Sequence, residues 1–371
     1  MRLAWRELRR QPSRFAIAAA ILSLIAILLM FLGGLLDGLV GDATGPLQAQ
    51  RADLVVYSAK SEDTLGRSRI GSATRSQVER SAGPAAVGGL GTVSLGARLD
   101  GRGPRDLVSI SLYGYELAPQ GLPVVPPATG EVIADDSLRA EGIRAGDTIW
   151  LGPDRTPVTV IGFDGTDTSY GSGTVWGSLR TWRQVLAANQ PGLPFGADDT
   201  QALVIRLDPT QTGDLAASID AATGGDTHTL SIAAAADAIP GVQAQRSTFN
   251  QIIGVTVAIA IVVVALFFAL LTVERTGRYG VLKAIGAGTG TLFAGVALQA
   301  VLVTVVASII GVATTLMFGA LIPPGSIPFR IRPTRLAGSV AVLLVAAVVG
   351  SAFSLRRVLR IDPAAAIGGT Q

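Results

Sequence analysis

The chain has 371 residues, of which 49% are hydrophobic and only 15% are charged, well below the quarter that is charged in typical soluble domains. Its mean hydropathy of +0.48 indicates a membrane protein with a substantial soluble part. It has no cysteine and a single histidine, His228, which excludes disulfides, thiolate chemistry and a multi-histidine metal cluster. We therefore expect no metal site and no cofactor bound by this chain.

Four apolar segments are long enough to cross a membrane, which takes about 20 residues. They lie at residues 15–36, 252–273, 292–321 and 336–353. Arginines precede the first segment, as in a signal peptide, but its 22 uncharged positions exceed the roughly 7–15 residues of a signal-peptide core, and no Ala-x-Ala site follows. The better interpretation is a retained membrane helix.

The segments between these helices complete the expected organisation. They are a cytoplasmic amphipathic N-terminus (1–14), an extracytoplasmic α+β domain and stalk (37–251), a cytoplasmic coupling segment (274–291), an external loop (322–335) and a cytoplasmic tail (354–371). The predicted fold is thus a four-helix membrane protein with a large α+β domain inserted between its first and second helices.

The charges around the helices predict their orientation, because short cytoplasmic flanks are rich in Lys and Arg. Eleven such residues lie in the N-terminus, the segment after the second helix and the tail, against three in the external loop: Arg330, Arg332 and Arg335. Both termini are therefore expected in the cytoplasm of a bacterial cell, with the chain in the plasma membrane.

The large inserted segment is acidic and the remainder of the chain is basic. Residues 37–251 hold 16 Lys and Arg against 24 Asp and Glu, whereas the rest holds 14 against 3. Because the positive charge gathers where lipid phosphates would attract it, membrane lipid is an expected partner and nucleic acid is not.

Short β-rich runs bounded by Gly, Pro and Asp alternate with short helical patterns in the inserted segment, which predicts an α+β domain. The predicted strands are 53–57, 107–112, 148–151, 158–162 and 203–207; the predicted helical stretches are 76–80, 137–140, 181–188 and 214–222. His228 lies in a polar run and is expected in a solvated loop.

The second membrane helix is expected to start early. No helix breaker follows Pro240 and Gly241 until the apolar run itself, so the helix is predicted from residue 242 to about 276. At 1.5 Å per residue this is roughly 50 Å, some 20 Å more than the hydrocarbon requires. We therefore expect a rigid stalk.

The segment at 274–287 reads ERTGRYGVLKAIGA and resembles the coupling-helix signature of the MacB/FtsX-type permeases. The start at 4–15 (AWRELRRQPSRF) and the end at 355–367 (LRRVLRIDPAAAI) also resemble that family, as does the order of one helix, a large outer domain and three helices. The family usually has a second acid where this chain has Arg278.

The resemblance implies that this segment docks on a separate ABC ATPase. The residues expected to couple the two are Glu274, Arg278, Tyr279, Gly280, Leu282, Lys283, Ile285 and Gly286. A helix lying on the lipid surface is the alternative. The chain has no G-x-x-x-x-G-K-[ST] loop, since the glycines at 286–290 lack the lysine, so ATP and Mg²⁺ are expected in the partner.

Within the superfamily, the stretches GLLDGL at 34–39 and LGRSRI at 65–70 resemble the DevC/HrtB branch, which includes haem and glycolipid exporters. The resemblance implies a homodimer on two ATPase copies that moves a hydrophobic or amphipathic substrate, haem or lipid-like, outward by mechanotransmission. The alternative is an FtsX-like signalling subunit that controls a cell-wall hydrolase. No arrangement of catalytic residues is evident, so we do not expect an enzyme.

Six residues in the membrane helices are candidates for substrate contact or helix packing. Met30 could offer a thioether to haem iron, although a core methionine is the commoner role. Asp37 could be a functional acid, although an acid that caps the helix at the membrane interface is commoner. Small residues with helical spacing let helices pack closely in lipid, within one subunit or at a dimer interface; these are Gly34, Gly38, Gly41 and Gly311.

Overall fold

The computed structural model of the chain describes residues 12–103, 105–164, 173–193, 195–196, 198–207, 214–274, 289–322 and 327–358. The chain divides into two compact units. The helical unit comprises residues 1–38, 246–322 and 329–371, and the inserted domain comprises residues 39–245 and 323–328. Each has its own hydrophobic cores.

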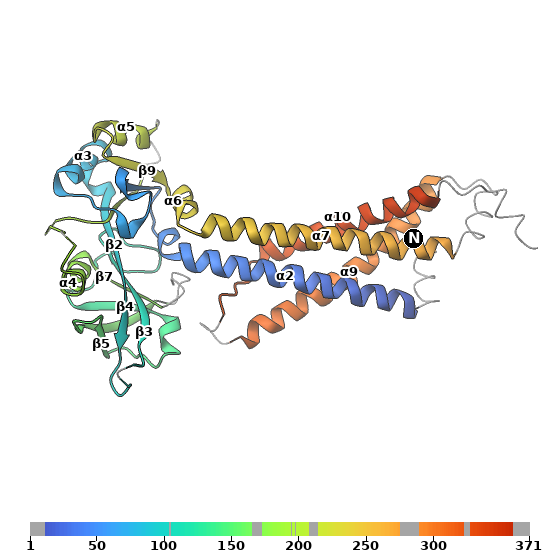
Figure 1. Cartoon of the computed structure of the whole chain (residues 1–371), viewed down its shortest axis with the longest axis horizontal. Helices are drawn as coiled ribbons and strands as arrows, with labels where there is room; N and C mark the ends of the chain where they lie inside the picture. The colour runs from blue at the N-terminus through green and yellow to red at the C-terminus, as the bar shows by residue number, and fades with distance from the viewer. Residues whose placement is uncertain are drawn as a thin grey trace, which may run out of the picture. The chain divides into compact units, whose positions relative to one another are not determined.

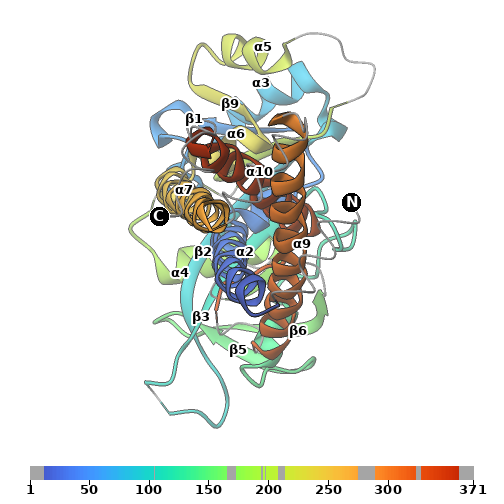
Figure 2. The same cartoon turned by 90° about the vertical axis from the view of Figure 1, so that its right-hand side faces the viewer.

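Four long helices make up most of the described helical unit: α2 (Pro12–Gln48), α7 (Val242–Val273), α9 (Thr289–Leu321) and α10 (Pro333–Val358). Figure 1 shows them lengthwise and Figure 2 from their ends. Each is long and apolar enough to cross a membrane. Helices suit this environment because every backbone group must be satisfied without water. The predicted fold class, four membrane helices with a large α+β domain between the first and second, is confirmed.

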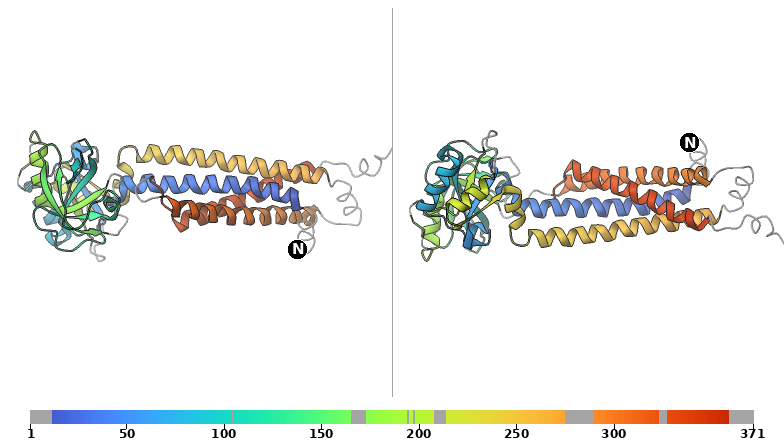
Figure 3. Two further views of the ribbon diagram at one scale, coloured as in Figure 1. Left: turned by 90° about the horizontal axis from the view of Figure 1, so that it is seen from below. Right: turned by 90° about the horizontal axis from the view of Figure 1, so that it is seen from above.

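Apolar side chains from all four helices meet in one core of the helical unit. Phe15 of α2, Phe268 of α7, Val303 of α9 and Ala347 of α10 are all almost fully buried there. A second core joins α2, α7 and α10. The helices run side by side in both views of Figure 3, as expected for helices whose inward faces pack on one another.

The outward faces of these helices are also apolar. Leu24 of α2, Leu266 of α7 and Ile309 of α9 are each more than 60% exposed. Hydroxyls within the helices bond their own backbone: Ser23 donates to the Ala19 carbonyl at 2.7 Å and Thr256 to the Ile252 carbonyl at 2.9 Å. Such outward faces suit a hydrocarbon environment.

The described part of the inserted domain is built on one nine-stranded sheet. Its strands are β1 (Leu54–Ser58), β2 (Val87–Arg98), β3 (Val108–Tyr115), β4 (Glu131–Asp135), β5 (Thr148–Leu151), β6 (Thr156–Asp164), β7 (Thr174–Ser178), β8 (Ala202–Ile205) and β9 (Thr227–Ser231). The order is β3-β7-β4-β6-β5-β2-β8-β1-β9, and β2 also pairs with β3. The strands β2, β3, β7, β4, β6 and β5 therefore close into a six-stranded ring.

Helix α4 (Leu179–Asn189) packs on this ring through Trp182, which is fully buried. The indole lies directly over two glycines of neighbouring strands. A Cβ at Gly91 of β2 would lie 2.5 Å from Trp182 Cε2, and one at Gly114 of β3 would lie 2.6 Å from Trp182 Cβ. Only glycine leaves room for the ring at these two positions.

The long strand β2 also joins the ring to the remaining strands of the sheet, β8, β1 and β9. Its first residues, Val87–Leu90, pair with β8, and the ladder continues through β1 to β9. Helices α3 (Ser72–Ala82), α5 (Leu215–Ala222) and α6 (Ile232–Ala238) cover this part of the sheet. Its cores contain Tyr57 and Tyr115, and burial raises the pKa of both hydroxyls.

All five predicted strands of the inserted domain are present, with ends shifted by a few residues. The predicted stretches at 76–80, 181–188 and 214–222 lie within or largely within α3, α4 and α5, and the turn at 137–140 is a 3-10 turn at Asp136–Arg139. The early start of the second membrane helix is confirmed, because α7 begins at Val242; its predicted end near 276 lies outside the described residues. The first helix runs beyond the predicted apolar span, to Gln48.

The expectation of a loop at His228 is wrong. His228 lies in β9, opposite Tyr57 of β1. Its side chain is half exposed, as expected, and its Nδ1 lies 2.6 Å from Oδ1 of Asp63. The polar run around it hid the strand, because Thr227 and Thr229 bond to the Asp220 carboxylate of α5, so polar side chains meet partners inside the domain.

Candidate functional site

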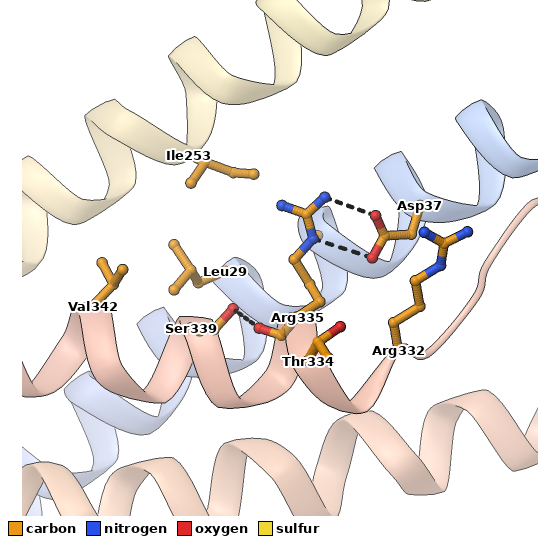
Figure 4. Close-up of a pocket in the computed structure, with 10 residues that line it drawn as sticks. Leu29, Asp37, Ile253, Arg332, Thr334, Arg335, Ser339 and Val342 are labelled. Carbon is orange, nitrogen blue, oxygen red and sulfur yellow. Dashed lines mark hydrogen bonds and ion pairs between the residues drawn. The ribbon is translucent and has the colours of Figure 1, made fainter. Parts of the chain in front are cut away.

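A cavity of about 400 Å³ lies among α2, α7, α10 and the residues just before α10, all within the helical unit. We call it the arginine cavity. Its described lining consists of ten residues: Leu29, Gly33, Asp37, Ile253, Arg332, Thr334, Arg335, Gly338, Ser339 and Val342. Its volume is within the range of small-ligand sites, about 300–1,000 Å³, and Figure 4 shows its lining.

An ion pair in the cavity lining joins α2 to α10 (Figure 4). Arg335 donates from Nη2 to Oδ1 of Asp37 at 2.7 Å and from Nε to Oδ2 at 3.1 Å. The Asp37 side chain is only 7% exposed, whereas that of Arg335 is 40% exposed. The two-pronged geometry is the one in which a guanidinium binds a carboxylate most strongly. Asp37 is thus held inside the helical unit by an arginine of α10, and its role, as a functional acid or as a cap at the membrane interface, stays a prediction.

Arg332 adds a second cation beside this pair. Its side chain is exposed and lines the cavity near Asp37. Among the described residues, no carboxylate lies within ion-pair distance of it. The cavity lining therefore carries two positive charges and one negative charge, and the second guanidinium is available to an anion.

The other end of the cavity is apolar. Leu29 lies two helical turns before Asp37 in α2, and Val342 lies two turns after Arg335 in α10. At 1.5 Å per residue these side chains are about 10–12 Å from the charged end along the helices. The cavity is therefore polar at one end and apolar at the other.

The segment leading into α10 is held against α2 by close contacts. The Arg330 backbone N–H donates to the Gly34 carbonyl at 3.0 Å, and the Phe329 ring stacks on Phe31 with centroids 5.0 Å apart. A Cβ at Gly34 would lie 2.5 Å from Phe329 Cε2. Glycine at this position thus lets the segment approach closely enough to place Arg332 and Arg335 in the cavity.

The other candidates in the membrane helices have different surroundings. Met30 is 1% exposed and is not among the residues that line the cavity. Gly38 and Gly41 are buried. A Cβ at Gly311 would lie 2.8 Å from the Ala26 Cβ, so Gly34 and Gly311 both pack closely within one chain. Whether any of these glycines also lies at a dimer interface stays a prediction.

Most of the expected coupling residues lie outside the described residues: Arg278, Tyr279, Gly280, Leu282, Lys283, Ile285 and Gly286. The exception is Glu274, an exposed residue just after α7 whose backbone N–H donates to the Leu270 carbonyl at 3.1 Å. The coupling assignment therefore continues to rest on the sequence motif.

Sequence reasoning missed the arginine cavity and the places of Arg332 and Arg335 in its lining. Arg330, Arg332 and Arg335 stood out as positive charges on the side where few were expected. Arg335 is explained by its pairing with Asp37. Two signals in the sequence could have found this pair. Arg335 is a positive charge on the side of the membrane where few are expected, and Asp37 is an acid at the end of another apolar span.

Known proteins are similar to this chain either over its C-terminal membrane helices or over its whole length. Residues 250–363, which include α9 and α10, match the model of the family described as FtsX-like permease C-terminal. A Staphylococcus haemolyticus protein, named as permease HrtB of a hemin transport system, is 23% identical over 372 residues, which cover 100% of both chains. An uncharacterized ABC transporter permease of Mycobacterium tuberculosis is 24% identical over 377 residues, 99% of each chain.

Among solved structures, the chain is similar to the extracellular domain of the noncanonic ABC-type transporter YknZ from Gram-positive bacteria. It matches 48% of this chain and 98% of its own length at 13% identity, with a TM-score of 0.33. This likeness is too weak to support an argument. The full-length relatives are therefore the informative ones.

Proposed function

This chain belongs to the FtsX/MacB-like family of ABC transporter permeases, and from that premise we propose that it is the membrane subunit of an exporter. The exporter moves a hydrophobic or amphipathic substrate outward. Hydrolysis of ATP on one side of the membrane shifts the helices, and the helices move the inserted domain on the other side. No substrate channel through the membrane is needed for this mechanism.

In this proposal both termini are cytoplasmic and the inserted domain lies outside the cell. The support is the charge distribution along the sequence, because eleven Lys and Arg residues flank the helices on one side against three on the other. Cytoplasmic flanks carry such an excess in membrane proteins generally.

A separate ATPase, present in two copies, supplies ATP hydrolysis to a homodimer of this chain. The support is that the sequence has no phosphate-binding loop of its own, while the ERTGRYGVLKAIGA segment falls inside the family match at 250–363. Tyr279, Leu282 and Ile285 recur every third residue and would give a short coupling helix one apolar face.

The observation that best supports amphipathic cargo is the arginine cavity. It has charged groups at one end and apolar groups at the other, and it lies among helices that can cross a membrane. An aqueous solute would gain nothing from the apolar end, and a hydrocarbon would gain nothing from the guanidinium groups. A molecule with both parts would use the whole cavity.

Haem and lipid-like molecules are the two substrate candidates. The names of the staphylococcal relatives refer to hemin transport, which favours haem. The composition of the arginine cavity favours a lipid-like molecule. The two differ in absorption spectrum and in the protein groups they need, so one transport assay can separate them.

The assay uses the chain and its ATPase in nanodiscs, with albumin in solution as an acceptor. We expect ATP to accelerate transfer of either hemin or a fluorescent lysolipid to albumin, and we expect no acceleration when the ATPase is omitted. Failure of ATP to accelerate either transfer would contradict the proposal. Activation of a cell-wall hydrolase bound through the inserted domain would instead favour the signalling alternative.

A further inference from the structure

We infer that the arginine cavity binds an aliphatic amphipathic anion, with its carboxylate or phosphate at Arg332 and Arg335 and its chain along the apolar end. The inference rests on the proposed transport function and deepens it by naming the chemical class of the substrate.

The charge of the lining suits a single anionic head. Two guanidinium groups face one carboxylate, which leaves one positive charge in excess. Asp37 occupies Nε and Nη2 of Arg335, and Nη1 points away from this contact in Figure 4. Arg332 and the remaining donors of Arg335 can therefore bind oxygen atoms of a ligand while Asp37 holds Arg335 in place.

The two ends of the cavity lie at depths that match a lipid-like molecule. Asp37 directly follows the predicted apolar span at 15–36, and Arg335 directly precedes the one at 336–353, so the charged end lies at the boundary of the hydrocarbon. Leu29 and Val342 lie about 10–12 Å farther along their helices, within the apolar spans. A head at the interface and a chain in the hydrocarbon would follow this gradient.

Part of the cavity lining is exposed at the surface of the helical unit. Val342 in its lining is 41% exposed and Gly338 is exposed. The neighbouring Ile252 of α7 and Val345 of α10 are 43% and 62% exposed. Because exposed apolar side chains on membrane helices face lipid, a molecule could enter sideways from the bilayer without passing through water.

The described lining residues offer no ligand that haem iron commonly uses. They include no histidine, cysteine, methionine or tyrosine, and the carboxylate among them, Asp37, is engaged by Arg335. Met30 is fully buried outside the cavity. The chemistry of the lining thus selects an aliphatic anion over haem at this position.

The test is photolabelling of the full chain in phosphatidylcholine nanodiscs with a fatty acid that carries a diazirine in its chain. We expect labelled peptides from the cavity walls of α2 and α10. Excess palmitate or lysophosphatidic acid should abolish the labelling, whereas hexadecanol, which lacks the charge, should not. Equal competition by hexadecanol would overturn the inference.

Three variants test the residues. Arg332→Gln removes an exposed cation that no described carboxylate needs, so the fold should survive, and we expect labelling to fall about tenfold, as the loss of a charge-assisted hydrogen bond implies. Arg330→Gln is the matched control, because this arginine lies in the same segment but not in the cavity lining; labelling should stay within about twofold. Undiminished labelling in Arg332→Gln would overturn the assignment.

The third variant, Asp37→Asn with Arg335→Gln, removes both charges of the pair without leaving either one unpaired. We expect it to retain the labelling that Arg332 supports and to lose the remainder when combined with Arg332→Gln. Persistent labelling in this triple variant would contradict anion binding here. A hemin Soret shift lost in Arg332→Gln would overturn the choice of an aliphatic ligand.

Nanodiscs that contain phosphatidylglycerol distinguish the source of the ligand. If this lipid suppresses the labelling, the occupant is an anionic bilayer lipid; if it does not, the occupant is a free single-chain amphipath, and both results support the anion site. The assay needs no ATPase, so it separates two failures. Labelling without palmitate-stimulated ATP hydrolysis would contradict the transport proposal alone, whereas stimulation without labelling would contradict the cavity assignment alone.

Discussion

At the scale of residues, the helical unit depends on a few polar and small groups placed among apolar ones. Asp37 is nearly buried, and burying a carboxylate without a partner is costly. Arg335 provides that partner through two hydrogen bonds while keeping part of its own side chain exposed. The pair ties α2 to α10 through two residues that lie 298 positions apart in the sequence.

We predict that either single change, Asp37→Asn or Arg335→Gln, lowers the thermal midpoint of the purified chain because it leaves the opposite charge without its partner. The double change should recover much of the loss, with a coupling energy of about 1–3 kcal/mol. A double-mutant cycle measured by thermal unfolding in detergent checks this. Additive losses in the double variant would show that the two residues act independently.

Gly34 offers a second prediction at this scale. Gly34→Ala should destabilise the chain by about 1–3 kcal/mol, as overpacking does, because the new Cβ would lie 2.5 Å from Cε2 of the Phe329 ring. Gly254→Ala is the matched control, since a Cβ there meets no atom within 4 Å in the described structure. Thermal midpoints of the two variants measure the difference; equal midpoints would contradict the close packing.

At the scale of elements, the helices and strands that could be predicted are those with a clear local sequence pattern. The membrane helices are long uncharged runs, and β1, β5, β6 and β8 are short β-rich runs with Gly, Pro or Asp at their ends. Strand β2 was missed because its glycines at 88, 89, 91 and 96 weaken strand propensity. Those at 88, 89 and 91 are needed for contacts made by distant residues, including Trp182, which no local pattern can show.

The packing of α4 on the strand ring gives the prediction at this scale. Gly114→Ala should loosen the inserted domain by about 1–3 kcal/mol, because the methyl group meets Trp182 Cβ at 2.6 Å. Gly162→Ala, in β6 with no atom within 4 Å of its Cβ, should be near neutral. Limited proteolysis of the full chain compares them, and greater sensitivity of the Gly162 variant would contradict the account.

The candidate site could also be predicted only in part from the sequence. Asp37 and Met30 could be selected from the sequence because they are unusual residues for their positions. The arginine cavity could not, since its lining comes from α2, α7 and α10, which are brought together only by helix packing. The coupling segment is the reverse case: its motif is local and strong, so the sequence predicts it without any three-dimensional information.

At the scale of the whole molecule, the orientation in the membrane determines on which side the inserted domain and the C-terminal tail lie. The chain has no cysteine, so a single introduced cysteine reports its own accessibility. Ser72→Cys, an exposed position of α3, should react with a membrane-impermeant maleimide on intact cells. Thr370→Cys in the tail should react only after the cells are permeabilised. The opposite pattern would reverse the proposed topology.

We propose that a separate ATPase drives this permease through residues 274–287, and ATP hydrolysis by the purified complex tests this claim most directly. We predict that substrate stimulates hydrolysis in the unmodified complex, and that Gly280→Asp or Leu282→Asp abolishes this stimulation while the inserted domain keeps its protease resistance. Undiminished substrate-stimulated hydrolysis in both variants would contradict the claim.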